Sequence, residues 1–269
     1  MTNRLLTALV MFTLTSSTAM ADDEGPEGET PMQKDERIAG LAGHYAAGVR
    51  LHLASGPDGA EYKSLNFAEL DLQARYNVSD LFTTYLNIPL SVKHPDGFET
   101  FGGVTVRGEL KLGSTFAVGA TVGMLRDGAF LLSEKDFPAW VGDLKFGTAL
   151  GPSLRLKAGA AYLRIDPSFV YQTSNADANT GFQLPVTATL RVARMLRVSG
   201  DIGLYSGDDF KVSASDGGRL GVGAAVDVQI SSIALRLGTG FASLLTDDAG
   251  FYPSVGKSLF FDVALKYVK

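Results

Sequence analysis

Two opposite charges interrupt an otherwise apolar or small-residue segment, RLGVGAAVDVQISSIALRLGTGF, which runs from Arg219 to Phe241. Apolar residues alternate with small or polar ones on both sides of Ser231-Ser232, and their parity switches there, as in two strands joined by a tight turn. A two-residue turn sets Asp227 directly opposite Arg236. The spacing therefore predicts a cross-strand ion pair, worth roughly 0.2 to 1 kcal/mol, on the face without large apolar residues.

The same alternation elsewhere places further charged side chains on the corresponding face of other segments. We expect this face to line the lumen of a barrel. The residues predicted to line it are Arg50, Arg75, Arg107, Lys111, Arg155, Lys157, Arg191, Asp227 and Arg236. Basic residues outnumber acidic ones on this face. Two interpretations follow: a lattice of salt bridges that closes the interior, or a pore that favours anions.

Catalytic and metal chemistry have little support in the residue types present. The chain contains three histidines, His44, His52 and His94, and none lies in the His-x-Ser pair of outer-membrane phospholipases. The HPDG segment at His94 is typical of a turn, and the spacing of the acidic residues between the expected strands matches no calcium loop. We therefore predict a protein that is not an enzyme, with no catalytic residue, no cofactor and no metal site.

The elements that must position the charged face are strands with a period of two. Most expected strands have about the length of a tilted membrane-spanning strand, ~9 to 11 residues. The twelve expected strands are 44–53, 68–78, 81–93, 103–113, 115–125, 140–149, 153–164, 183–192, 196–205, 219–229, 233–241 and 258–267.

The connections between these strands alternate between short and long. Short turns are expected, for example, at Leu150–Pro152 and Ser231-Ser232, and long loops at Ala54–Phe67 and Ile165–Phe182. Tight periplasmic turns and long external loops produce this alternation in membrane barrels. The pattern therefore favours a transmembrane barrel over a soluble sandwich.

Aromatic residues form two expected belts on the apolar parity, as in the interfacial girdles of membrane barrels. The belt beside the short turns comprises Tyr45, Tyr76, Phe82, Phe116 and Tyr267. The belt beside the long loops comprises Trp140, Tyr162, Phe182 and Phe241.

The first forty residues divide into two segments. Residues 1–21 carry Arg4, a short apolar run and the small-x-small sequence Ala19-Met20-Ala21, which predicts a cleaved signal peptide. Residues 22–40 are rich in acids and contain two prolines, which indicates a periplasmic linker. This acidic segment is interpreted either as a solvated tail or as a plug for the basic lumen. Residues 41–269 are expected to form the barrel.

Two short stretches carry a resemblance to a known group. YNVSDLFTTYLNIPL (Tyr76 to Leu90) and VGDLKFG (Val141 to Gly147) resemble elements of outer-membrane proteins that include the channel-like proteins linked to phenol and hydrocarbon degradation. In that group the Gly-Asp element follows the Ile-Pro strand closely, whereas here an extra hairpin intervenes. The resemblance implies a barrel and the passage of a hydrophobic solute, and it transfers no site residue.

The final strand, SLFFDVALKYVK, resembles the C-terminal assembly signal of bacterial outer-membrane barrels, although such signals usually end on an aromatic residue and this chain ends on Lys269. The fold class predicted is all-β: a transmembrane antiparallel up-and-down β-barrel of about 12 strands. The absence of any cysteine excludes disulfides, and the absence of a Lys/Arg-rich run argues against nucleic-acid binding.

The expected location is the bacterial outer membrane, with both termini in the periplasm. The expected partners are outer-membrane lipid, lipopolysaccharide and a small-molecule solute, and the pattern predicts no particular oligomeric state. The function predicted is a passive channel for a small solute. The alternatives are a structural or adhesive barrel with a closed lumen and, third, a lipid-active enzyme.

Overall fold

The computed structural model describes residues 41–58, 61–93, 102–126, 144–173, 178–206, 210–212, 218–241, 244 and 259–269. The predicted signal peptide (1–21) and acidic linker (22–40) lie outside the described residues, as does Trp140. No helix within these ranges is long and apolar enough to cross a membrane.

The described chain is built of antiparallel strands. They are β1 (Tyr45–Asp58), β2 (Glu61–Asn77), β3 (Phe82–Lys93), β4 (Gly103–Lys111), β5 (Phe116–Arg126), β6 (Leu144–Ala158), β7 (Ala161–Ile165), β8 (Ser168–Thr173), β9 (Ala178–Ala193), β10 (Leu196–Tyr205), β11 (Arg219–Ile230), β12 (Ile233–Phe241) and β13 (Leu259–Val268).

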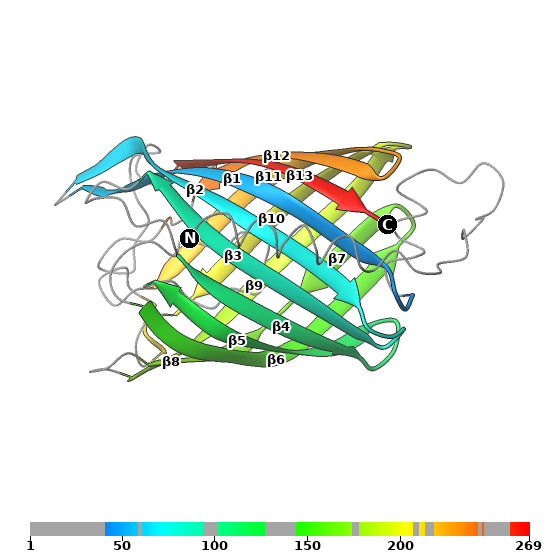
Figure 1. Ribbon diagram of the computed structural model, residues 1–269, viewed down its shortest axis with the longest axis horizontal. Coiled ribbons are helices and arrows are strands. Elements are labelled where there is room, and N and C mark those ends of the chain that lie inside the picture. Colours follow the sequence, from blue (N-terminus) through cyan, green and yellow to red (C-terminus); the bar gives the residue numbers. More distant parts are fainter. Residues whose placement is uncertain are drawn as a thin grey trace, which may run out of the picture.

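The sheet closes on itself, because β13 pairs with β1 and β9 pairs with β10. Figure 1 shows the strands running obliquely, side by side, around the wall. Strands β7 and β8 together occupy one place in this wall, between β6 and β9. The result is a twelve-stranded antiparallel barrel, which confirms the predicted fold class.

The break between β7 and β8 interrupts hydrogen bonding but not register. Leu154 pairs with Ile165 and Leu150 pairs with Phe169, so the same alignment continues on both sides of the break. Between these pairs lie Pro152 and Pro167, which lack the backbone N–H that a ladder needs. The two pieces therefore form one wall strand with a local gap at Pro167, opposite Pro152 of β6.

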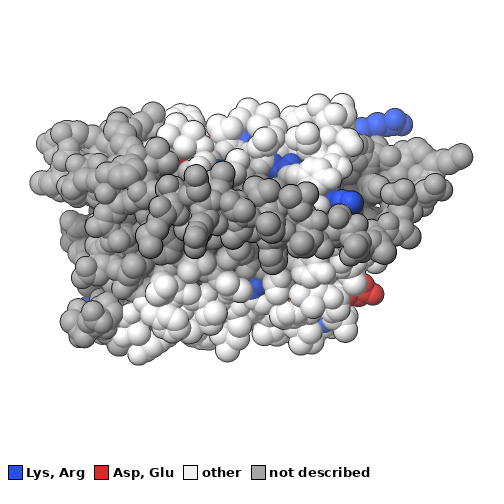
Figure 2. Space-filling view, in the orientation of Figure 1, with Lys and Arg blue, Asp and Glu red and all other residues white. Residues whose placement is uncertain are grey.

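Burial along β13 shows which face is which. Val263 and Leu265 are 44% and 50% exposed, whereas the intervening Asp262 and Ala264 are 5% and 1% exposed. The face with the aspartate is thus inside, and the face with the large apolar residues is outside. Figure 2 shows the outer surface of the barrel, which is mostly uncharged where the structure describes it. This inversion of the soluble pattern is the arrangement expected of a lipid-facing wall.

The turn predicted at Leu150–Pro152 is wrong, because these residues lie inside β6. The chain instead turns at Gly159-Ala160, where Gly159 has a φ of 59° that glycine adopts without strain. The predicted strands 140–149 and 153–164 are accordingly replaced by β6 and β7. Pro152 fits within this strand because its ring faces outward and its missing donor falls at the gap opposite Pro167.

Two of the expected long loops are largely strand. β1 continues to Asp58 and β2 begins at Glu61, within the predicted loop Ala54–Phe67. β8 and the start of β9 occupy much of the predicted loop Ile165–Phe182. In both hairpins the strands stay paired beyond the length needed to span a bilayer. The alternation of side chains alone does not mark where such a hairpin ends.

The aromatic belt beside the short turns is present on the outer face. Tyr76, Phe116 and Tyr267 are each more than two-fifths exposed, and the rings of Tyr45 and Tyr267 lie 6.2 Å apart. Tyr162 does not belong to the other belt. It pairs with Lys157, on the inner face near the Gly159-Ala160 turn, because the relocated turn reverses the parity of its strand.

Candidate functional site

The strand parity places each predicted lumen residue on the inner face. Arg50 and Arg107 are buried, and Arg75, Lys111, Arg155, Arg191, Asp227 and Arg236 are partly buried. Lys157 lies beside the Gly159-Ala160 turn and is exposed. These residues fall into three groups along the wall, and Arg191 belongs to two of them.

The first group is an oblique series of cross-strand neighbours, here called the charge row. Asp227 pairs with Arg236 in register, and the two side chains lie 3.6 Å apart, which confirms the predicted ion pair. Ser231, in the turn between them, has a φ of 53°, as tight hairpin turns require. The row proceeds from strand to strand through Arg191, Arg197, Asp227, Arg236, Ala264, Arg50 and Asp71.

The buried end of the charge row is a tight ion pair. The Nε of Arg50 donates to Oδ2 of Asp71 at 2.6 Å, and both side chains are almost fully buried. Arg236 adds a contact across β11, since its Nη2 donates to the Ser199 hydroxyl at 3.3 Å. Side chains along the row are therefore held in place by neighbours on adjacent strands.

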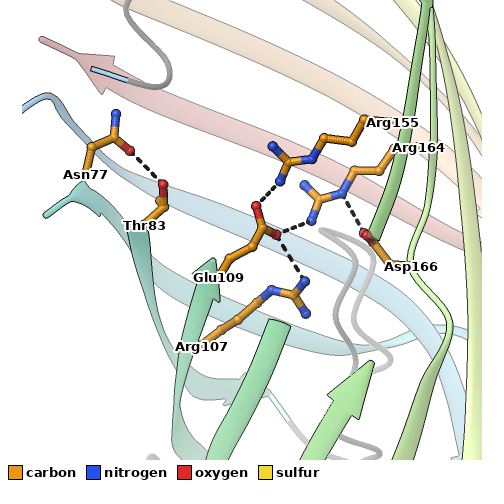
Figure 3. A network of polar contacts seen from close by, with 7 residues as sticks. All are labelled: Asn77, Thr83, Arg107, Glu109, Arg155, Arg164 and Asp166. Carbon is orange, nitrogen blue, oxygen red and sulfur yellow. Dashed lines mark hydrogen bonds and ion pairs between the residues drawn. The ribbon is translucent and has the colours of Figure 1, made fainter. Parts of the chain in front are cut away.

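The second group, here called the Glu109 cluster, gathers three guanidinium groups around one carboxylate (Figure 3). Glu109 on β4 is fully buried, and it accepts from Nη2 of Arg107 and of Arg164, at 3.1 Å each, and also from Arg155. The Nε of Arg164 lies 2.5 Å from Oδ2 of Asp166. Charge-assisted contacts of this kind are the strongest hydrogen bonds available to side chains.

Glycines make the room that the Glu109 cluster needs. Glu109 pairs with Gly119 on β5, and Gly119 pairs with Gly151 on β6, so no side chain stands on the wall along this line. The guanidinium of Arg107 lies directly over Gly119, where a Cβ would come within 2.4 Å of its Nη2. The long side chains of β4, β6 and β7 can therefore meet above β5.

The third group, here called the basic rim, lies near the end of the barrel that holds the short turns. Each member is within two residues of that end of its strand. The members are Arg75, Lys111, Lys157, Arg191 and Lys266. Tyr45 and Lys269 pair at the same end, so the first and last strands of the barrel meet there.

A further buried contact closes the seam between the first and last strands. Nδ1 of His52 on β1 lies 2.5 Å from Oδ1 of Asp262 on β13, and its ring lies 5.4 Å from that of Phe260. Glu69 is the cross-strand neighbour of His52 on its other side, and it is also buried. Across the ranges that the structure describes, no group of three or more His, Asp or Glu side chains has the arrangement of a metal site.

Arg164 and Asp166 are interior residues that the sequence analysis missed. The strand predicted at 153–164 gave Arg164 the outward parity, and Asp166 fell in an expected loop. A signal was present, because Leu154 and Leu156 are even whereas Leu163 and Ile165 are odd. This is the same parity switch that located the turn at Ser231-Ser232.

No protein-family model matches the chain, and no curated protein matches it at a significant level. Solved structures do match it. The NanC porin superposes with a TM-score of 0.53 at 11% identity, covering 83% of this chain and 98% of that one. The KdgM porin in complex with disordered oligogalacturonate has a TM-score of 0.52 at 8% identity, covering 82% and 98%.

An outer membrane channel from Pseudomonas putida F1 has a TM-score of 0.51 at 12% identity, covering 93% of this chain and 100% of that one. At such low identities the similarity concerns the fold. The described chain thus has the β-barrel fold found in bacterial outer-membrane porins and channels.

Proposed function

We propose that this chain is a passive channel of the bacterial outer membrane for a small anionic solute, with the short-turn end of the barrel facing the periplasm. The observation that carries the proposal is the basic excess on the inner wall of a lipid-facing barrel. The described basic residues of this wall are Arg50, Arg75, Arg107, Lys111, Arg155, Lys157, Arg164, Arg191, Arg197, Arg219, Arg236 and Lys266. The acidic ones are fewer: Glu69, Asp71, Glu109, Asp166, Asp201, Asp227 and Asp262.

An excess of fixed positive charge in a low-dielectric tube raises the local concentration of anions and lowers that of cations. The basic rim would attract an anion to one mouth of the barrel, and the charge row and the Glu109 cluster would offer guanidinium donors further inside. The residues proposed to contact the solute are Arg50, Arg75, Arg107, Lys111, Arg155, Lys157, Arg191 and Arg236. Arg50, which is buried in its ion pair with Asp71, is the least accessible of these residues.

One structural neighbour shows that a barrel of similar fold can hold an anionic molecule. The KdgM porin was solved with oligogalacturonate, a chain of acidic sugars, so a barrel of similar fold accommodates a polyanion in that protein. A neutral, hydrophobic solute is the alternative that the resemblance to the phenol-linked group suggests. It would give conductance without a strong preference for anions.

Single-channel recording in a planar bilayer tests the proposal directly. The purified barrel should give discrete current steps in potassium chloride, and a salt gradient should give a reversal potential whose sign indicates chloride permeation. A reversal potential of the opposite sign would contradict anion passage. Gel migration of heated and unheated samples provides the necessary check that the barrel is folded.

A closed structural or adhesive barrel is the competing proposal, and burial inside the wall favours it. Glu69, Asp71 and Glu109 are each at most 1% exposed, so parts of the interior are tightly packed. A folded protein that inserts into bilayers but never conducts would support this alternative. The small residues of β11 and β12, which include Gly221, Gly223 and Gly238, argue for space along part of the remaining wall, whereas Gly240 is buried beside the Phe260 ring.

A further inference from the structure

We infer that the Glu109 cluster is a binding site for the carboxylate group of a solute, in which Arg107, Arg155 and Arg164 supply the donors. The inference rests on the proposed function and deepens it, because it names the chemical group that is recognised and the residues that recognise it.

The contacts of Glu109 show that the three guanidiniums can bind a carboxylate. Arg107, Arg155 and Arg164 come from β4, β6 and β7 and converge on its two oxygens (Figure 3). A guanidinium is a planar fork of donors that matches a planar carboxylate. The geometry already assembled around Glu109 is therefore suited to a second carboxylate beside it.

The cluster holds more donors than acceptors. Each guanidinium carries five N–H donors, about fifteen in all, whereas each carboxylate offers about four acceptor positions. Glu109 and Asp166 together supply about eight such positions, and the positive groups outnumber the negative ones. The cluster therefore has a net positive charge and unused hydrogen-bonding capacity.

Some of the unused donors are identified. The side chain of Arg107 is 8% exposed, and its Nε and Nη1 are buried without a hydrogen-bond partner. The Nε of Arg155 is also buried without a hydrogen-bond partner. Buried donors in native proteins are nearly always satisfied by protein, water or ligand, so these atoms indicate an acceptor that the described residues do not supply.

The lumen gives access to the cluster from one side. Arg155 and Arg164 are 19% and 26% exposed, whereas Glu109 beneath them is fully buried. The Arg107 guanidinium covers Gly119 on the wall of the same cluster, so Arg155 and Arg164 are its more exposed arginines. An incoming carboxylate would therefore approach over Arg155 and Arg164 and share their donors with Glu109.

The experiment uses the full barrel with acetate as the probe. In planar bilayers at constant ionic strength, acetate should reduce the chloride current saturably. Arg155→Gln removes the more accessible of the two arginines that have an unpartnered Nε. It should raise the half-blocking concentration about tenfold, the loss expected for one charge-assisted interaction. Inorganic phosphate serves as a second probe and shows whether a tetrahedral oxyanion is also accepted.

Arg194→Gln is the matched control, because it removes one positive charge from the exposed turn between β9 and β10. It should leave block by acetate unchanged. Equal weakening of block in both variants would mean that overall charge, rather than this site, attracts the anion, and would overturn the inference.

A second measurement does not require conduction. Binding to the folded state raises thermal stability, so acetate should raise the unfolding temperature of the wild type more than chloride at equal ionic strength, and this difference should vanish in Arg155→Gln. An anion-selective channel without any acetate effect would refute the site but leave the proposed function standing. Stabilisation by acetate in a barrel that never conducts would support the site and contradict the proposed channel.

Discussion

Arg155 on β6 contacts Glu109 on β4 across the whole width of the intervening strand β5. Directly opposite Glu109, β5 presents Gly119, which leaves room for side chains to meet above this strand. A Cβ at Gly119 would collide with the Arg107 guanidinium, which contacts the same carboxylate. The ion pairs of the Glu109 cluster therefore depend on the glycine at position 119 as well as on the charged side chains.

The first prediction concerns Glu109→Gln. The amide keeps the size of the carboxylate but loses the charge that three guanidiniums surround, so the folded barrel should lose about 1 to 3 kcal/mol of stability. It should also become more selective for anions. Denaturant unfolding of the lipid-reconstituted barrel measures the first effect and the reversal potential the second.

Asp227→Asn provides the comparison for Glu109→Gln. Asp227 lies on the same inner wall but is 13% exposed and makes a longer contact of 3.6 Å to Arg236. Its loss should cost less stability while changing lumen charge by the same amount. Equal stability losses would mean that burial and the number of contacts do not determine the strength of these ion pairs.

The second prediction concerns Gly151→Ala. A Cβ at this position would lie 1.9 Å from the carbonyl oxygen of Pro167, which is backbone and cannot rotate away. The variant should be destabilised by about 1 to 3 kcal/mol, the usual cost of overpacking, and should lose its folded gel mobility at a lower temperature. At Gly238, also on the inner face, a Cβ would meet nothing closer than 3.4 Å. Gly238→Ala should therefore behave like the wild type.

The alternation of apolar and polar residues was sufficient to predict the barrel, the number of wall strands and the pairing of Asp227 with Arg236. A strand has only two faces, and a two-residue turn leaves no freedom in register. The burial of Asp262 between exposed Val263 and Leu265 is the direct outcome of that rule. Each of these features depends on residues within one strand or one hairpin, so it can be predicted from the sequence.

The Glu109 cluster could not be predicted in the same way. Which arginines reach Glu109 depends on the displacement between β4, β6 and β7 around the barrel, and this displacement is not encoded within any one strand. The turn expected at Leu150–Pro152, in place of the actual turn at Gly159-Ala160, also gave Arg164 the wrong parity. Parity on both sides of a suspected turn was the better guide, since Leu156 and Leu163 marked the correct position.

The third prediction concerns the basic rim. Lys111→Glu combined with Lys157→Glu places two negative charges at the short-turn mouth, and anion preference should fall by about twofold or more, since a unit charge 4 Å away interacts by about 1 kcal/mol even in water. The reversal potential under a potassium chloride gradient measures this change. High salt should reduce the difference between the variant and the wild type because it screens exposed charges.

Arg194→Glu is the control for the rim, since its charge lies in the exposed turn after β9 and not on the inner wall. It should change selectivity little. If it shifted the reversal potential as much as the double variant, the selectivity would arise from charge around the barrel mouth in general.

The fourth prediction concerns the seam where β1 meets β13. His52 is buried, its Nδ1 contacts Asp262, and its ring lies against Phe260. His52→Ala removes a hydrogen-bond partner from the buried carboxylate and the ring contact from Phe260, so it should cost about 1 to 3 kcal/mol. The loss should appear as a lower temperature for the change in gel mobility, because this pair of strands completes the closed sheet.

His44→Ala is the matched control for His52→Ala, since His44 precedes β1 and its backbone oxygen, which the substitution retains, accepts from Asn77. It should leave the transition temperature unchanged. Wild-type stability in His52→Ala would mean that the main-chain ladder from Ala46–Val268 to Ala54–Phe260 closes the barrel without help from the interior charges. The buried ion pairs would then matter for the solute that the wall recognises and not for the wall itself.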